Sequence, residues 1–242
     1  MREMRAPPCL SGLIAKLLLQ LFPSNCPSCD SPSDSVSHAP FCKNCWSGVR
    51  KYTGPSCAVC ATPFSSEDAV ICAGCMKKRP LFSKAMSFGI YEGILAEAIN
   101  LYKFHGIKRL AAPLGEFLTD FDSAGIDAVV PVPLSITGLR NRGFNQSLLL
   151  AKTFSDKEDI PLVMNGLMKC RETGPQIGLS AKERAKNLKD AFSTSRRFDG
   201  MRVLLVYDVM TTGSTANECA KQLLRAGAED VSVLTLARAS AL

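Results

Sequence analysis

Eight of the eleven cysteines occur in four Cys-x-x-Cys pairs, the spacing with which a tight turn points two thiolates at one metal ion. The pairs are Cys26/Cys29, Cys42/Cys45, Cys57/Cys60 and Cys72/Cys75. Two pairs complete a tetrahedral site of four sulfurs that is closed to water, so the sequence predicts two structural Zn²⁺ ions. Sequential ribbons, in which neighbouring pairs share an ion, are the simplest arrangement. An interleaved cross-brace would use the same ligands.

The segment that carries these pairs, residues 23–80, is rich in Pro, Ser and Gly and has few residues that could build a core. Metal binding would therefore supply most of its folding energy. A disulfide framework is the rival interpretation, and the pair spacing favours zinc. The three other cysteines are predicted to be core or surface thiols.

A second group of candidate residues follows the apolar run Val203–Val206, which is typical of a strand buried on both faces of a parallel sheet. Asp208 stands at the carboxyl end of this strand, and a helix is expected from Thr215 to near Gly227. The turn between them supplies the candidate phosphate-binding residues Thr211, Thr212, Gly213, Ser214 and Thr215.

Phosphate is the ligand expected at this turn, because unpaired backbone N–H groups and the helix dipole favour an anion at a helix N-terminus. Asp208 is placed to hold sugar hydroxyls or a hydrated Mg²⁺, so the stretch suits a ribose phosphate. An ordinary capped helix is the alternative. Neither G-x-x-x-x-G-K-[ST] nor a G-x-G-x-x-G after a strand occurs, which argues against nucleoside triphosphatases and dinucleotide-binding proteins.

Two cationic segments could hold further phosphates. In the first, Lys103 is followed by His105 and interleaved with Tyr102 and Phe104, a mixture that can bind phosphates and stack bases, or that simply ends a solvated helix. In the second, Arg140 and Arg142 flank a Gly-containing loop, and Asn145 is the expected N-cap of the next helix.

Two guanidiniums beside the end of a strand form a polyanion site, because arginine presents fork-shaped donors that match phosphate. A basic surface loop is the alternative interpretation of Arg140 and Arg142. The net charge of +7, from 29 Lys and Arg against 22 Asp and Glu, likewise favours acidic partners.

Several elements must position these side chains. Strands are expected near residues 87, 129, 204 and 233, separated by helical segments, which predicts a parallel α/β sheet with helices on both faces over residues 84–242. Ligands then gather at the carboxyl ends of the strands. Residues 1–22 are predicted to form an amphipathic helix that docks on the protein or on a membrane surface. This apolar stretch is too short to span a bilayer and lacks a cleavage site, so we expect a cytoplasmic protein.

The stretch around Asp208 resembles the phosphoribosyl-pyrophosphate (PRPP) loop of type I phosphoribosyltransferases, in which an apolar strand is followed by two acids and, two residues later, by TTG-x-T. The second acid, Asp208, and the whole TTGST are present, but Tyr207 stands where the first acid is expected. The resemblance implies a type I phosphoribosyltransferase-like fold, with PRPP and Mg²⁺ as ligands. Because both acids hold ribose hydroxyls in that family, Tyr207 weakens the expectation of turnover.

The motifs VPVPL, RGFNQ and R-E-T-G-P-Q-I-G-L-S-A-K-E-R-A-K-N are similar to those of the competence protein F (ComF) family, whose members also carry an N-terminal double zinc ribbon. The resemblance covers nearly the whole chain. It implies that Arg140 and Arg142 lie near the pyrophosphate. It also implies that a mobile hood closes over the site; its implied residues are Thr173, Gln176, Arg184 and Asn187. Independently of the family, Ser180 and Glu183 are placed as a capping box for the helix there.

Three functions remain open at this stage. The first is an enzyme that transfers the phosphoribosyl group of PRPP, with Asp208, Arg140, Arg142 and Arg184 as catalytic residues and Lys103 as a further phosphate ligand. The second is a protein that binds single-stranded DNA and assists DNA-uptake proteins, because the family resemblance implies a role in natural transformation or in the use of external DNA. The third is a catalytically silent adaptor that retains the PRPP site.

Overall fold

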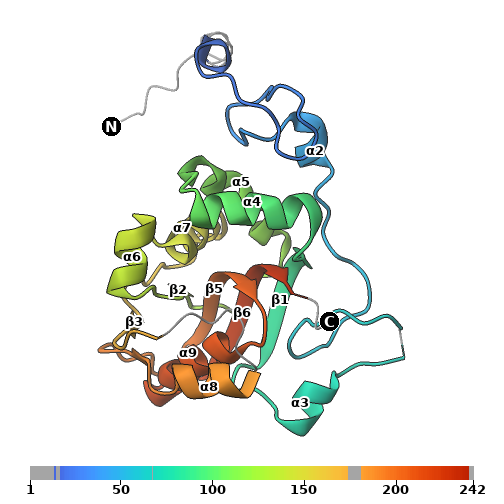
Figure 1. Ribbon diagram of the computed structural model, residues 1–242. Coiled ribbons are helices and arrows are strands. Elements are labelled where there is room, and N and C mark those ends of the chain that lie inside the picture. The colour runs from blue at the N-terminus through green and yellow to red at the C-terminus, as the bar shows by residue number, and fades with distance from the viewer. Residues whose placement is uncertain (1–13, 15–16, 67, 174–180, 240–242) are drawn as a thin grey trace.

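The computed structural model describes residues 14, 17–66, 68–173 and 181–239, and its centre is a four-stranded parallel sheet in the order β1-β6-β5-β2 (Figure 1). The strands are β1 (Lys84–Ile90), β2 (Ala128–Pro131), β5 (Arg202–Met210) and β6 (Asp230–Arg238). All four lie where the apolar runs predicted them. β5 and β6 occupy the middle of the sheet and are buried along most of their length. The expected parallel α/β fold is confirmed.

Helices cover both faces of the sheet, as expected (Figure 1). One face carries α4 (Gly93–Phe104), α5 (Ala111–Glu116) and α7 (Gln146–Glu158), and the other carries α8 (Ala181–Leu188) and α9 (Ser214–Arg225). Short 3₁₀ turns at Lys108–Leu110 (η1) and Phe117–Asp120 (η2) flank α5. A helix α6 (Ile136–Arg142) follows β2, and a small antiparallel pair is formed by β3 (Met168–Lys169) and β4 (Phe192–Ser193).

Alternation along β5 divides the core in two. Leu204 and Val206 pack in the cluster under α4, α5 and α7, whereas Val203, Leu205 and Tyr207 pack in the cluster under α9. Successive side chains of a strand point to opposite faces, so this division follows directly from the apolar run. The same alternation sends neighbouring side chains near the end of β5 to different sides of the sheet.

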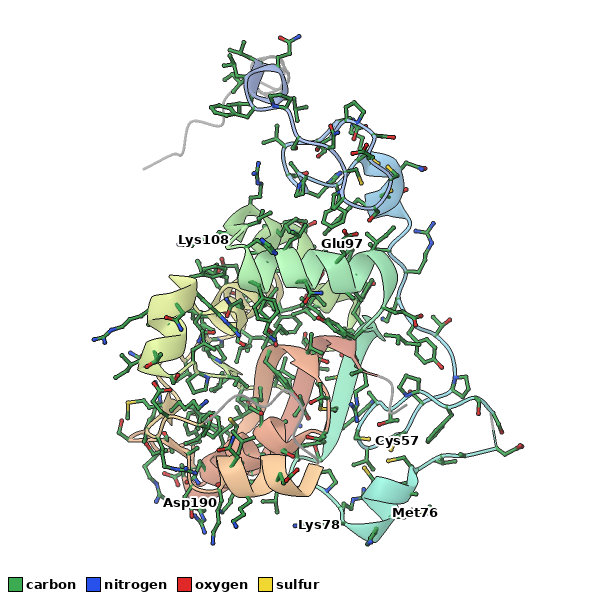
Figure 2. The ribbon with its side chains drawn as sticks, viewed as in Figure 1. Cys57, Met76, Lys78, Glu97, Lys108 and Asp190 are labelled. Atoms are coloured by element: carbon green, nitrogen blue, oxygen red, sulfur yellow. The ribbon has the colours of Figure 1, made fainter. Side chains whose placement is uncertain are left out.

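The first cysteine-rich segment lies above α4, with the short helix α2 (Lys43–Ser47), and is joined to the body by stacked rings (Figure 1). Trp46 stacks on His38 at 5.3 Å and on Phe117 at 5.4 Å between ring centroids, and Phe117 stacks in turn on Phe88 of β1 at 4.4 Å. The hydroxyl of Ser28 donates to the Glu97 carboxylate at 2.6 Å; Figure 2 shows Glu97 on α4 facing this segment.

The second cysteine-rich segment, with the short helix α3 (Ala73–Lys77), lies against β1 instead (Figure 1). The N–H of Ala85 on β1 donates to the carbonyl of Val59 at 2.8 Å, so the segment pairs locally with the edge of the sheet. Cys57, labelled beside β1 in Figure 2, belongs to the same buried cluster as Val59 and Ala85. The two segments therefore contact different parts of the body.

Ile14 and residues 17–21 are helical, whereas residues 1–13 and 15–16 of the helix predicted over residues 1–22 lie outside the described residues. Leu17, Leu21 and Phe22 expose more than half of their surface, at 54%, 62% and 72%. Docking of this segment, on the protein or on a membrane surface, stays a prediction. Among the described residues, no helix has the length and apolar character to cross a bilayer.

Candidate functional site

The candidate site is centred on Asp208, which points from β5 toward α4 and is only 8% exposed. The Lys103 ammonium lies 2.8 Å from Asp208 Oδ2, and the N–H of Val209 donates to Oδ1 at 2.7 Å. Burial opposes ionisation of Asp208. The charge and hydrogen bond of Lys103, the Val209 N–H and the charge of Arg142 outweigh it and hold the pKa of the carboxyl below its usual range. Asp208 is therefore a buried carboxylate at neutral pH.

The predicted phosphate turn follows directly. β5 continues to Met210, residues 211–213 form a bend, and α9 begins at Ser214 rather than at Thr215. Gly213 is the N-cap and adopts φ 76°, a left-handed conformation that favours glycine, and it offers no side-chain cap to the helix. The hydroxyls of Thr212 and Ser214 lie 2.9 Å apart at this helix end. Hydroxyls and first-turn amides thus gather at the start of α9, and their role as phosphate ligands stays a prediction.

The segment with the two arginines is a helix, which corrects the expected Gly-containing loop. Ser135 caps α6 by accepting the N–H of Gly138 at 3.1 Å, and Gly143 ends the helix at φ 73°. Both arginines lie in its last turn. Arg140 is exposed, whereas Arg142 is half-buried, donates to Gln146 Oε1 at 3.2 Å and lies with its guanidinium 5.3 Å from the centre of the Phe104 ring.

Gln146, to which the sequence analysis gave no role, joins these elements. Gln146 is buried at the start of α7. Its side-chain NH₂ donates to the Lys103 carbonyl at 3.5 Å, and its backbone carbonyl accepts a hydrogen bond from the Tyr102 hydroxyl at 2.8 Å. Tyr102 is fully buried and cannot stack on a base, which corrects one of the two aromatic candidates. Phe104 is 61% exposed. In the sequence, Gln146 is marked only by its position directly after the expected N-cap Asn145.

Side chains of two residues, Lys169 and Glu172, contact neighbouring groups just before the implied hood or at its first residue, Thr173. Lys169 on β3 donates to the Thr173 hydroxyl at 2.8 Å, and burial lowers the pKa of Lys169. The Glu172 carboxylate accepts the N–H of Thr137 at 3.0 Å and so ties this segment to α6. Lys169 and Glu172 were not singled out in the sequence. Glu172 is the acid of the R-E-T motif and Lys169 lies two residues before that motif, but the sequence carries no signal for these contacts.

The structure describes only some of the remaining residues of the implied hood. Gln176 and the expected cap Ser180 lie outside the described residues. Arg184 lies on α8, and its side chain is also outside the described set, so its predicted role stays a prediction. The carbonyl of Asn187 accepts the Arg171 guanidinium at 2.9 Å. The helix predicted over this motif is present as α8.

Tyr207 lies on the opposite face of the sheet from Asp208, in the cluster under α9, and is 6% exposed. We expect Tyr207→Phe to keep wild-type stability, because the ring fills the same volume. Tyr207→Asp should lower the free energy of unfolding by about 3 kcal/mol or more, because it empties a packed site and buries a carboxylate. Urea denaturation measures both. Wild-type stability of Tyr207→Asp would contradict this packing role.

The eight paired cysteines form two four-sulfur groups, and the sulfurs of each group lie within 4.8 Å of one another. One group is Cys26, Cys29, Cys42 and Cys45, and the other is Cys57, Cys60, Cys72 and Cys75. The pairing is therefore sequential, and the cross-brace is excluded. Sulfurs about 2.3 Å from a tetrahedral zinc are about 3.8 Å apart. The observed Cys29–Cys42 and Cys60–Cys72 separations are 3.7 and 3.6 Å.

Backbone amides support this assignment to zinc. Cys42 Sγ accepts the N–H of Cys45, and Cys72 Sγ accepts the N–H of Cys75, both at 3.4 Å. At Cys60, burial opposes ionisation, but hydrogen bonds from the Thr62 hydroxyl and N–H lower the pKa to about 6. The thiolate is the form of cysteine that binds metal, and both four-sulfur sites fit structural Zn²⁺.

Known families and solved structures resemble parts of this chain. The model of the double zinc ribbon domain matches residues 17–76. Among solved structures, the glutamine PRPP amidotransferase of B. subtilis is 25% identical and aligns with 52% of this chain and 25% of its own, at a TM-score of 0.36. The purine phosphoribosyltransferase of Pyrococcus horikoshii is 16% identical over 56% of this chain and 84% of its own, at a TM-score of 0.31.

Curated relatives match over most of their length. Competence protein F of Haemophilus influenzae is 36% identical over 211 residues, which are 82% of this chain and 90% of the relative. DNA utilization protein YhgH of Salmonella typhimurium is 33% identical, over 89% and 97% of the two chains. Competence protein ComFC of Bacillus subtilis is 29% identical, over 81% and 83%. The expected resemblance is confirmed, and the chain belongs to the competence protein F family.

Proposed function

We propose that the protein binds PRPP or a related ribose phosphate at the carboxyl end of β5 and serves in the uptake or use of DNA in the cytoplasm. One observation carries the proposal: an ionised, buried Asp208 lies directly before the hydroxyl-rich turn that starts α9. In this proposal the turn holds the 5′-phosphate and Asp208 accepts hydrogen bonds from the ribose hydroxyls. The DNA role is supported by the names of the relatives, which are competence and DNA utilization proteins.

The cations around the site suit the rest of the ligand. The charges of Lys103 and Arg142 both lower the pKa of Asp208, and Arg140 lies two positions before Arg142 in the last turn of α6. The pyrophosphate would lie against these three side chains, and bound Mg²⁺ would neutralise part of its charge. If phosphoribosyl transfer occurs, Asp208 stabilises the positive charge that develops at the anomeric carbon, and Arg184 belongs to the hood that excludes water. Phosphoribosyl transfer is thus a more specific proposal than ligand binding alone.

Calorimetry on the zinc-loaded protein tests this assignment. We would titrate PRPP with and without Mg²⁺, and ribose 5-phosphate and pyrophosphate separately, because the two halves of the ligand address different elements. The proposal expects PRPP to bind more tightly than either half, and Mg²⁺ to strengthen the binding of PRPP and pyrophosphate. If none of the three compounds gives a binding signal, the ribose phosphate assignment is wrong.

Single-stranded DNA is a second candidate ligand, and it is favoured by Phe104. This ring is exposed at the end of α4, with Lys103 Nζ 5.8 Å and the Arg142 guanidinium 5.3 Å from its centre. An aromatic face flanked by cations can stack a base while the cations hold the neighbouring phosphates. The same residues border the proposed ribose phosphate site. A nucleotide chain could therefore approach along α4 and α6.

Replacing Phe104 tests this second function. We expect Phe104→Ala to weaken binding of a labelled oligothymidylate about tenfold, because stacking contributes about 1–3 kcal/mol per base. Arg140→Gln should flatten the salt dependence of binding, since each lost phosphate contact lowers the slope by about 0.7. Fluorescence anisotropy at several salt concentrations measures both effects. Phe104→Leu is the matched control, and wild-type affinity in that variant would mean that the ring does not stack on DNA.

A further inference from the structure

Arg238, the last residue of β6, is a charged side chain in the interior, with 7% exposure. Its guanidinium donates hydrogen bonds to groups on three separate segments of the chain. The acceptors are the backbone carbonyls of Cys60 (3.0 Å), Met210 (2.9 Å), Thr211 and Ala239 (3.2 Å), and the Thr62 hydroxyl (2.8 Å). A buried charge is costly unless its donors are satisfied, and here they are satisfied by backbone. Arg238 therefore joins the second four-sulfur site to the end of β5.

At the second four-sulfur site, Arg238 contacts groups that surround one predicted zinc ligand, Cys60. Because a guanidinium can only donate, the Thr62 oxygen accepts from Arg238 and its own proton is available for Cys60 Sγ, 3.1 Å away. Arg238 also binds the carbonyl of Cys60 itself. Groups that hydrogen-bond metal ligands orient them and raise metal affinity. Arg238 and Thr62 together hold this ligand for the second site.

On the other side, Arg238 fixes the backbone that enters the phosphate turn. It binds the carbonyls of Met210 and Thr211, and the N–H of Ala239 donates to the Met210 carbonyl at 2.9 Å. In a trans peptide the carbonyl and the following N–H point in opposite directions. Holding the Thr211 carbonyl toward Arg238 therefore aims the N–H of Thr212 to the other side of the chain. Arg238 therefore contacts the backbone that leads into the turn.

We propose that Arg238 couples zinc binding at Cys57, Cys60, Cys72 and Cys75 to the geometry of the phosphate turn. With zinc bound, the ribbon presents the Cys60 carbonyl and the Thr62 hydroxyl to Arg238, which in turn holds the Met210 and Thr211 carbonyls. When zinc leaves, Arg238 loses two acceptors and the turn loses its support. Arg238 is a positioning residue, and this regulation rests on the function proposed for the turn.

Two readouts that need no ligand test the coupling in the full-length, zinc-loaded protein. Peptide-resolved alkylation in the presence of a chelator reports exposure of Cys60, with Cys29 as the internal control from the first site. We expect Arg238→Gln and Thr62→Val to speed alkylation of Cys60 about tenfold, the usual scale for a group that orients a metal ligand, and to leave Cys29 unchanged. Arg202→Gln, at the opposite end of β5, should change neither cysteine.

Amide exchange by NMR reports the turn. The N–H groups of Asn217 and Ala239 donate to the carbonyls of Gly213 and Met210 and should exchange several-fold faster when a chelator removes zinc from the wild type. In Arg238→Gln both amides should already exchange fast, and chelation should speed them by a smaller factor than in the wild type. If Arg238→Gln does not fold, Thr62→Val carries the test.

Two results would overturn the coupling: unchanged alkylation of Cys60 in both variants, or unchanged exchange of both amides after zinc removal. Failure of PRPP to bind would instead count against the proposed function and leave these readouts intact. If PRPP binds, reciprocity requires it to slow alkylation of Cys60 in the wild type and not in Arg238→Gln.

Discussion

The Asp208→Asn variant is expected to lose PRPP binding by about 10- to 100-fold, since a hydrogen bond to a charged group contributes about 1.5–3 kcal/mol and the amide accepts ribose hydroxyls less well. It should also lower stability, because Lys103, 2.8 Å from the carboxylate, is left beside a neutral group. Calorimetry measures the first effect and urea denaturation the second.

A double variant separates these two effects. In Asp208→Asn with Lys103→Met the unpaired charge is gone, so stability should return toward the wild-type value while PRPP binding stays lost. Asp127→Asn, at the amino end of the sheet, is the matched control and should bind PRPP normally. Wild-type PRPP affinity in the Asp208→Asn single variant would exclude Asp208 from the ribose site.

Zinc removal is expected to have the larger effect on the fold. Cys57, Cys60 and Cys75 belong to the cluster under α9, and Cys26 and Cys42 belong to the cluster under α4, so each site supports part of the main core. Structural zinc contributes about 10–16 kcal/mol to folding in zinc-finger peptides. We expect chelation to unfold residues 24–78 and to lower the melting temperature by more than about 10 °C.

Metal analysis and circular dichroism measure this outcome, and zinc added back should restore the melting temperature. Cys170→Ser is the matched control, because this exposed cysteine lies outside both four-sulfur sites and should not alter zinc content. Thiol titration of the denatured, zinc-free protein should find free thiols at all eight ligands. Disulfides among these cysteines, with no bound zinc, would contradict the structural assignment.

Local patterns were sufficient to predict much of this protein. Each Cys-x-x-Cys pair is a local turn, and each central strand is a continuous apolar run, so ligands and strands could be predicted without knowledge of the fold. Asp208 and the turn before α9 could be placed for the same reason, because adjacent residues form strand, turn and helix. The pairing of the cysteines could not, since both arrangements use the same eight residues.

Features that depend on distant residues were missed. Arg238 stands at the end of a strand, where an arginine is usually solvated, and its partner Cys60 lies 178 positions away. A Gly-containing loop was expected where α6 lies, but the Ser135 cap and the carboxylate of Glu172, which accepts the N–H of Thr137, stabilise the first turn of this helix. Tertiary contacts determine both the burial of Arg238 and the helical state of α6.

Tyr207 is a different case, because its orientation could have been predicted. Strict alternation along β5 sends Asp208 toward Lys103 and Tyr207 to the opposite face. The family motif pairs the two positions as acids, whereas alternation along the strand separates their side chains.

The aromatic stack between the first ribbon and the body gives the protein an intrinsic optical probe. Trp46 is the only tryptophan in the chain, and it lies between His38 of the ribbon and Phe117 of the body. Burial lowers the pKa of His38, so the imidazole beside the indole is uncharged at neutral pH and does not quench it as an imidazolium would. Emission excited at the red edge of the absorption band therefore comes from a single fluorophore at this junction. The emission wavelength and fluorescence lifetime of Trp46 therefore report, without any added label, whether the first ribbon is packed against the body.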